Sequence, residues 1–145
     1  GERGVGYVPQ DGALFPHLSV ARQLAFSLVL RKTEPAQIAK RVEELSERLG
    51  IKHLLDRMPD SLSGGECQRV ALARAMVSEP SLILADEPSG NLDQKTGKEI
   101  MDLLFKMCRG RGQSLILVTH NHELAKQSDR TLVLSEGRLK RVQST

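Results

Sequence analysis

Aromatic residues are nearly absent from this chain. It contains three Phe, one Tyr and no Trp among its 145 residues. Surfaces that bind single-stranded nucleic acid commonly stack bases on aromatic side chains. The net charge of +3 is mild and does not by itself indicate a basic nucleic-acid surface. We therefore expect no nucleic-acid partner.

Long apolar runs and cysteine clusters are also missing. No apolar run approaches the roughly 20 residues that span a bilayer, and these residues show no secretory signal pattern. Cys67 and Cys108 lack metal-ligand spacing, which is typical of two reduced cytosolic thiols. Any membrane association is therefore expected to come through a partner. The chain begins with Gly rather than Met, and we interpret it as a piece of a longer protein.

A Leu-Ser-Gly-Gly-Glu stretch, residues 62–66, precedes an apolar helical pattern that Pro80 ends. Ser63 is suited to cap that helix, and Gly64 and Gly65 let a ligand approach the backbone N–H groups. A helix start attracts anions because its first N–H groups are unpaired and the helix dipole is positive there. The stretch therefore predicts a phosphate-facing helix end, although an ordinary capped helix is an equally good interpretation of these residues alone.

Two short apolar runs end in polar residues that suit phosphoryl transfer. Asp86 and Glu87 follow the run 82–85, and His120 follows the run 115–118. Neither run alternates, so we expect two strands that are covered on both faces. Strands joined by helices pair in parallel, which gathers the residues at their carboxyl ends into one site.

Each of these residues has a predicted role and a structural alternative. Asp86 is suited to hold Mg²⁺, and Glu87 to act as general base for an attacking water. His120 is suited to donate a hydrogen bond to a γ-phosphate. Outside a shared site, Glu87 would be a surface carboxylate and His120 a core histidine bonded to a carbonyl.

Spacing of apolar residues predicts the remaining elements. A strand at 5–8 is followed by the Gln10 loop and by helices capped at Ser19 and started by Pro35. Beyond the first of the two apolar runs, the pattern predicts helices over 94–109 and 121–127 and a hairpin about Glu136-Gly137, with strands at 131–134 and 138–142.

Taken in order, these motifs resemble those of ATP-binding cassette (ABC) proteins. Residues 62–66 resemble the signature motif, 82–87 the Walker B strand, 89–93 the D-loop, and His120 the switch histidine. Gln10, after Gly-Tyr-Val-Pro, resembles the Q-loop glutamine. The resemblance implies an α/β, P-loop NTPase-like ABC cassette, with a mainly parallel sheet and an α-helical signature subdomain. It also implies domain parts at 1–18 (Q-loop strand and loop), 19–78 (helical subdomain) and 79–145 (Walker B, D-loop and switch-histidine core).

The resemblance further implies a site for ATP and Mg²⁺. The catalytic residues would be Glu87 and His120, and Asp86 with Gln10 would serve the metal. Nucleotide-binding residues would be Gln10, Ser63, Gly64, Gly65, Glu66 and Asp93. The signature residues would act on the ATP of a second cassette, and Asp93 would shape the interface between the two. The Gln10 loop, which carries Leu14 and Phe15, would contact transmembrane permease subunits, placing the protein in the cytoplasm at the inner face of the membrane.

One motif of that family has no counterpart here. No G-x-x-x-x-G-K-[ST] phosphate loop occurs in the sequence, and Gly97-Lys98 is followed by Glu99. In the resembled fold we expect the strand that leads into this loop to lie beside the strand 82–85. Without it, that strand should have an unpaired edge.

The sequence favours the ATP-hydrolysing subunit of a transporter. The segment between Gln10 and Ser63 is too short for the coiled coils of chromosome-maintenance cassettes. Residues 6–18 resemble importers of metal ions and oxyanions, whereas residues 85–93 resemble lipoprotein-releasing and macrolide-export cassettes. Two alternatives stay open: a non-enzymatic interaction module and a translation-associated cassette. A neighbouring gene with several apolar 20-mers would favour transport.

Overall fold

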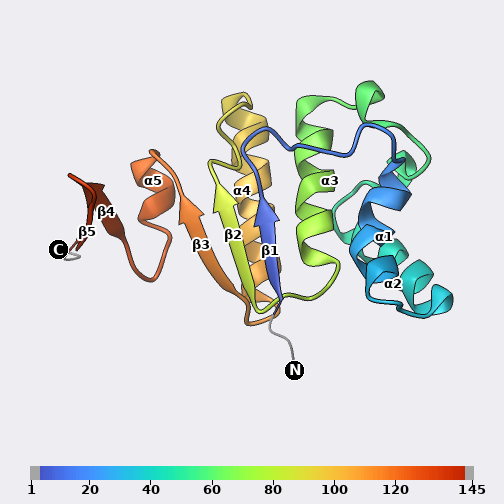
Figure 1. Ribbon diagram of the computed structural model, residues 1–145. Coiled ribbons are helices and arrows are strands. Elements are labelled where there is room, and N and C mark those ends of the chain that lie inside the picture. Colours follow the sequence, from blue (N-terminus) through green and yellow to red (C-terminus); the bar gives the residue numbers. More distant parts are fainter. Residues whose placement is uncertain (1–3, 143–145) are drawn as a thin grey trace.

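Three parallel strands form the centre of the molecule. The computed structural model describes residues 4–142, and its main sheet has the order β1 (Val5–Val8), β2 (Leu82–Asp86) and β3 (Ser114–Val118). Strand β2 pairs with β1 on one edge and with β3 on the other (Figure 1). The carboxyl ends of β2 and β3 therefore meet at one edge of the sheet.

Two long helices cover one face of this sheet. Helix α3 (Gly64–Met76) packs on β1 and on α4 (Gln94–Arg109), and Figure 1 shows α4 behind the strands. Two more helices, α1 (Val20–Leu30) and α2 (Pro35–Arg48), lie on the far side of α3. Short 3₁₀ turns at Lys52–Leu54 and Pro59–Ser61 lead from α2 back to α3.

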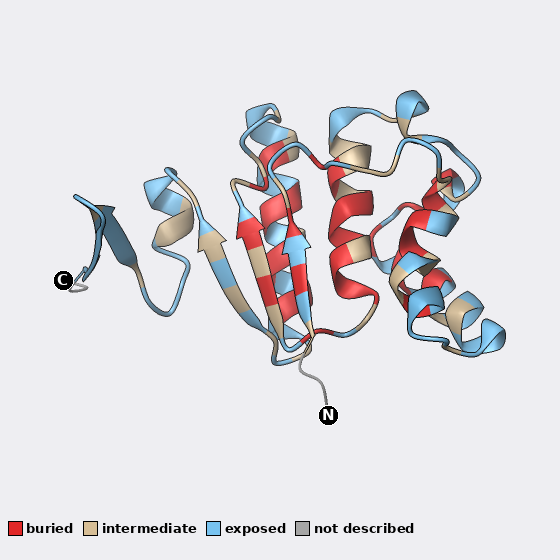
Figure 2. Cartoon of the chain, viewed as in Figure 1, coloured by how far each residue is buried: buried red, intermediate tan, exposed pale blue. Residues whose placement is uncertain are grey.

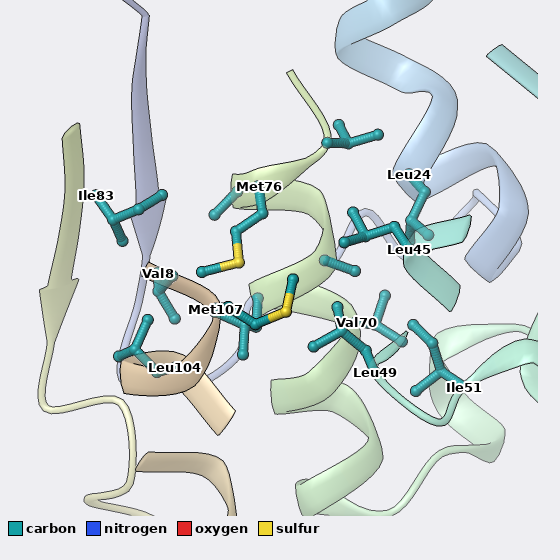
Figure 3. Close-up of a cluster of buried hydrophobic side chains, with 14 of the residues drawn as sticks. Val8, Leu24, Leu45, Leu49, Ile51, Val70, Met76, Ile83, Leu104 and Met107 are labelled. Atoms are coloured by element: carbon teal, nitrogen blue, oxygen red, sulfur yellow. The ribbon is translucent and has the colours of Figure 1, made fainter. Parts of the chain in front are cut away.

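The hydrophobic core runs from the covered sheet face through α3 to α1 and α2. Figure 3 shows Met76 between the sheet residue Ile83 and the helical residues Leu24 and Leu45. All four side chains are at most 1% exposed. Because α3 is apolar on opposite sides, it joins the helical part and the sheet into one continuous core.

Most of the sequence-based helix limits agree with the structure, but the helix predicted over 121–127 is shorter. Helix α1 follows Ser19, although the Ser19 side chain makes no capping hydrogen bond, and Pro35 opens α2. Helix α4 spans the predicted residues, and α5 (His122–Ala125) is capped by Asn121. Within residues 4–142, none of the helices combines the length and apolar character needed to cross a bilayer.

The prediction that both apolar runs are covered on each face is wrong. On β3, Ile116 is 53% exposed and Val118 is 56% exposed. On β2, only Ile83 and Ala85 are buried, and the alternate residues are half-buried or exposed. Helices α3 and α4 cover one face, and nothing in the described part of the chain covers the other (Figure 2).

Strand register shows which residues share that open face. Tyr7 of β1 is opposite Leu84 of β2, which in turn is opposite Ile116 of β3. Paired residues in neighbouring strands point to the same side of a sheet. The open face, as we call it, therefore carries an apolar row, consisting of Val5, Tyr7, Leu82, Leu84, Ile116 and Val118.

The expected unpaired edge of the strand 82–85 is also corrected. Strand β2 is central and has ladder partners on both sides. Within residues 4–142, the edges of this sheet are β1 and β3. The error arose from placing the phosphate-loop strand next to β2, a position that β1 and β3 occupy.

The predicted hairpin is present and stands apart from the core. Strands β4 (Leu132–Ser135) and β5 (Arg138–Arg141) pair antiparallel as a second sheet. Glu136 and Gly137 both have positive φ, which matches a turn of type I′. Most hairpin side chains are exposed (Figure 2), whereas Leu124 and Ala125 of α5 are half-buried.

Candidate functional site

The carboxyl end of β2 holds Asp86 and Glu87 in different conformations. Asp86 is the last strand residue and is exposed, on the side of the open face by strand alternation. Glu87 has φ of +42°, which lies in the left-handed region. This conformation costs a non-glycine residue about 1–2 kcal/mol. Its N–H still donates to the Val118 carbonyl at 2.9 Å. The chain therefore turns sharply at Glu87 while it stays attached to β3.

The Glu87 carboxylate is held by the residues that follow β3. Its Oε1 accepts from the His120 backbone N–H at 2.7 Å and lies 2.7 Å from His120 Nδ1. Its Oε2 accepts a longer hydrogen bond from Thr119 Oγ1, at 3.3 Å. The predicted convergence of Glu87 and His120 is present in the structure.

This geometry constrains what each group can do. When His120 Nδ1–H donates to Glu87, a neutral ring leaves Nε2 as an acceptor. A ring that also donates to a phosphate through Nε2 must carry a proton on both nitrogens. His120 is 84% exposed at its side chain, whereas Glu87 is 18% exposed. The ring therefore extends into solvent, and the carboxylate lies below it.

A cleft of about 430 Å³ opens next to this pair. It lies between the first half of α4 and the segment that joins β3 to α5. Charged, amide and hydroxyl groups make up much of its lining, which includes Glu87, Asp93, Lys98, Asp102, Thr119, His120, Asn121 and Glu123.

Gln10 lies beside the turn that follows Glu87. Its Nε2 lies 3.5 Å from Asn91 Oδ1, a long hydrogen bond. A Cβ on Gly90 would lie 2.8 Å from the same Nε2 and 3.3 Å from the Glu87 carbonyl. A side chain at residue 90 would displace the Gln10 amide from its place beside the turn after Glu87. No role was predicted for Gly90 or Asn91, which lie in the predicted D-loop, or for Thr119, which directly precedes His120.

The start of α3 forms a complete capping box. Ser63 Oγ accepts from the Glu66 N–H at 3.3 Å, and Glu66 Oε2 accepts from the Ser63 N–H at 2.8 Å. Ser63 Oγ also lies 2.9 Å from Glu66 Oε2 and donates to it. Hydrogen bonds from the Ser63 backbone and side chain lower the pKa of Glu66. The predicted cap is confirmed, and the Ser63 hydroxyl proton is directed at Glu66.

The two glycines of residues 62–66 pack against the turn that precedes α4. A Cβ on Gly65 would lie 2.7 Å from Thr96 Cγ2, and one on Gly64 would lie 3.4 Å from Leu92 Cδ2. Close packing within this chain thus requires glycine at 65, in addition to any approach of a ligand. The N–H and hydroxyl of Ser63 bond to Glu66, and in the described residues no hydrogen bond joins Ser63 to Glu87 or His120.

Asp93 has a local structural task. Its carboxylate accepts from the N–H groups of Lys95 and Thr96, both at 3.1 Å, and so caps α4. Hydrogen bonds from Thr96 are the main cause that lowers the pKa of Asp93. Asp93 was predicted at an interface and not as a helix cap, although an Asp before a helical run is a common capping signal.

The residues suggested for Mg²⁺ form a partial set. Among residues 4–142, no cluster of three or more His, Cys, Asp or Glu is arranged to hold a metal. Mg²⁺ in nucleotide sites takes one or two protein ligands and completes its shell with water and phosphate oxygens. Exposed Asp86 and the amide oxygen of Gln10 fit such a set in donor type.

These motifs and this fold define an ATP-binding cassette, and the chain belongs to the ABC transporter family. The family profile named "ABC transporter" matches residues 2–90. Relatives at 42–49% identity, covering more than nine-tenths of the chain, support the same assignment.

Two kinds of relative are found. The chain is 47% identical over 142 residues to the molybdate/tungstate import ATP-binding protein WtpC of Thermococcus kodakarensis, covering 97% of the chain and 43% of that protein. It is 42% identical over 135 residues to the lipoprotein-releasing system ATP-binding protein LolD 2 of Caulobacter vibrioides, covering 93% of the chain and 59% of that protein. The two resemblances seen within the sequence are thus confirmed.

Solved structures agree with the fold. The ATP-binding cassette MJ0796, in a dimeric post-hydrolysis state bound to ADP and Pi, matches with a TM-score of 0.81 and 32% identity over 97% of this chain and 64% of that one. The protein cbiO1 of Clostridium perfringens, part of the ABC transporter complex cbiONQ, matches with a TM-score of 0.85 and 37% identity over 94% of this chain and 55% of that one. This chain spans about half the length of its relatives.

Proposed function

We propose that the protein binds and hydrolyses ATP as the energising subunit of an ABC transporter. The observation that carries the proposal is the pairing of Glu87 with His120 at the carboxyl ends of β2 and β3. Membership of the family and the names of relatives from both importing and lipoprotein-releasing systems support it. We assign the energising step, which those two kinds of system share.

In the proposed reaction, Glu87 Oε2 accepts the proton of the attacking water. Oε1 already accepts two hydrogen bonds from His120, whereas Oε2 has only the longer bond from Thr119. Oε2 is therefore the freer acceptor, and Thr119 aims it. The Mg²⁺, held by Asp86 and Gln10, would neutralise charge on the phosphates.

The signature residues act on the nucleotide of a second cassette in this proposal. The Ser63 hydroxyl donates to Glu66 and has no hydrogen bond to Glu87 in the described residues. For Ser63 to bind a γ-phosphate, its proton must turn from Glu66 to the phosphate oxygen. Asp93 would contribute through the position of α4, which it caps. The MJ0796 cassette is dimeric in its ADP-bound structure, which supports a paired arrangement.

Permease subunits are the proposed membrane partners, placing the protein at the cytoplasmic face of the membrane. The Gln10 loop carries Phe15, whose ring lies 4.9 Å from that of Phe26 on α1. Phe26 is 40% exposed, and the neighbouring α1 residues Val29 and Leu30 are 57% and 69% exposed. This exposed apolar surface suits a protein partner.

Turnover by the full-length protein tests the proposal. Loss of a general base should lower ATP turnover of Glu87→Gln by roughly 100-fold or more and leave ATP binding intact. The control is Glu47→Gln, which changes an exposed carboxylate of α2 that pairs with Lys52. Turnover by Glu87→Gln equal to that of the unaltered protein would contradict the role of Glu87. Absence of ATP binding and turnover in the unaltered protein would favour an interaction module.

The 145 residues alone should bind ATP weakly. They contain no phosphate-loop sequence, and that loop supplies the backbone cradle and the lysine that contact the β- and γ-phosphates. We expect turnover no faster than background in this chain. Calorimetric titration with MgATP, and a phosphate-release assay, would measure both quantities. A turnover that Glu87→Gln abolishes would contradict this expectation.

A further inference from the structure

The loop of residues 9–18 joins β1 to α1 and is held along its length by polar side chains from two helices. The buried Gln68 of α3, 2% exposed, donates from Nε2 to the Pro9 carbonyl at 3.0 Å. Further along α3, Arg74 donates from Nη2 to the Ala13 carbonyl at 2.6 Å. Both ends of the first half of the loop are thus attached to the same helix.

The second half of the loop is attached to α1. Gln23 is fully buried, and its Nε2 donates to the Phe15 carbonyl at 2.6 Å and to the Leu18 carbonyl at 3.1 Å. Its Oε1 accepts from the Phe15 N–H at 3.1 Å and lies 3.5 Å from Arg74 Nη1. Arg74 also lies over the Phe15 ring, 5.1 Å from its centroid. Gln23 thus holds the Phe15 backbone, and Arg74 contacts the Phe15 ring.

By contrast, the loop has a weak connection to the nucleotide side of the sheet. Among residues 4–142, its side-chain hydrogen bond in that direction is the 3.5 Å contact between Gln10 and Asn91. The contacts with α1 and α3 are shorter, and Gln23 and Gln68 are buried, where losing a partner leaves a polar group unsatisfied. The loop is therefore held more firmly by α1 and α3 than by the nucleotide side of the sheet.

We propose that Gln23, Gln68 and Arg74 are positioning residues that make the loop of residues 9–18 move together with α3. The identity of the ligand at the start of α3 and of the partner at Phe15 rests on the proposed function. The start of α3 carries Ser63 and the two glycines, and the middle of the loop carries Phe15. Occupancy at the start of α3 and docking at Phe15 are then linked through these three side chains, and the coupling is reciprocal.

Packing at Gly12 supports the attachment. Gly12 has φ of +59°, and a Cβ there would lie 2.7 Å from Gln68 Oε1. The loop backbone therefore passes directly against the Gln68 side chain. Both the backbone conformation and the close contact call for glycine at this position.

Amide hydrogen exchange in the full-length protein, with and without MgATP, tests the inference. Arg74→Met and Gln23→Met remove the polar contacts and keep most of the side-chain volume. Without nucleotide, exchange over residues 10–18 should rise roughly tenfold in each variant, as expected for the loss of about one net hydrogen bond. With nucleotide, the unaltered protein should change its exchange at both 63–66 and 10–18. The variants should change at 63–66 alone.

Arg69→Met is the matched control. Arg69 lies on the same helix and is also half-buried, but it donates to the Leu49 carbonyl and pairs with Glu99. It should leave the exchange of residues 10–18 unaltered. Exchange over β2 reports whether each variant is folded. Arg74→Lys keeps one donor for the Ala13 carbonyl and should restore part of the protection of residues 10–18.

The outcomes separate this inference from the proposed function. Exchange over residues 10–18 that is as slow in both variants as in the unaltered protein would overturn the positioning roles. So would a loop that responds to MgATP in Arg74→Met as it does in the unaltered protein, or a loop that fails to respond in the unaltered protein while 63–66 responds. The arm without nucleotide decides the positioning roles even where ATP binding, and with it the proposed function, fails.

Discussion

Leucines in the helical part and in the hairpin have opposite surroundings. Leu45 on α2 is 0% exposed and packs in the core that α3 shares with the sheet. Leu134 on β4 is 70% exposed, and Leu139 on β5 is 67% exposed. Both regions have well-formed secondary structure with favourable local sequence. The difference shows that local sequence determines whether a helix or strand forms. Burial of its apolar side chains depends on which other segments pack against it.

The same contrast occurs within the main sheet. Ile83 on β2 is 0% exposed because α3 and α4 cover its face, whereas Ile116 on β3 is 53% exposed on the open face. Parallel sheets in known folds are covered on both faces. The chain spans about half the length of its curated relatives. The apolar open face and the β3 edge therefore suit packing against further protein.

The largest difference is expected for Leu→Ala changes in the two regions. Leu45→Ala removes buried methyl groups and leaves a cavity, which should lower the free energy of unfolding by about 2–5 kcal/mol. Leu134→Ala alters an exposed side chain, and the change should stay within about 0.5 kcal/mol. Urea denaturation followed by circular dichroism measures both values. Equal losses would show that the hairpin is packed in solution and would break the comparison.

A smaller difference is expected between the two isoleucines of the sheet. Ile83→Thr buries a hydroxyl against α3 and α4 and should cost about 1–3 kcal/mol. Ile116→Thr keeps a β-branched side chain on the open face and should change the free energy of unfolding by less than about 0.5 kcal/mol. It should also reduce self-association, because exposed apolar sheet surfaces pair with other chains.

Size-exclusion chromatography over a range of concentrations measures that self-association. Val133→Thr on the hairpin is the control, since Val133 is 47% exposed but lies outside the main sheet. If Ile116→Thr left self-association unchanged and Val133→Thr reduced it, the chains would associate through the hairpin.

Much of the fold followed from local patterns in the sequence. Helix limits at Pro35 and Ser63 were correct because proline and the capping box act over three or four residues. The exposure of Ile116 and Val118 could not be predicted, since an apolar run has the same pattern whether or not a second layer covers it. Placement of the central strand required knowing which strands pair, and that depends on contacts distant in sequence.

For the candidate site, the residues at strand ends were identified and their partners were missed. Glu87 and His120 converge because parallel strands end at one edge of a sheet, as predicted. The positive φ of Glu87 and the bond from Thr119 follow from the turn geometry after β2, which residue types alone do not determine. Whether these residues perform the proposed roles stays a prediction.

The smallest effect on the free energy of unfolding is expected for two glutamates, one on a packed helix and one on an exposed helix. Hydrogen bonds from Ser63 lower the pKa of Glu66, at the start of the packed helix α3. A hydrogen bond and the charge of Lys126 lower the pKa of Glu123, on the short exposed helix α5. A carboxyl with a lowered pKa stabilises the folded state above its unfolded-state pKa, near 4.5 for Glu66. That contribution is lost as the pH falls through the lower, folded-state value.

Glu66→Gln should therefore destabilise the protein at neutral pH and have a decreasing effect below about pH 4. The glutamine oxygen can still accept from the Ser63 N–H, so only the charge at the helix start is lost, about 0.5 kcal/mol after screening by solvent. Glu123→Gln should have no measurable effect, because Glu123 and Lys126 are 77% and 72% exposed. Urea denaturation at several pH values measures both. An effect of Glu66→Gln that persists below about pH 3 would show that the capping geometry, rather than the charge, stabilises α3.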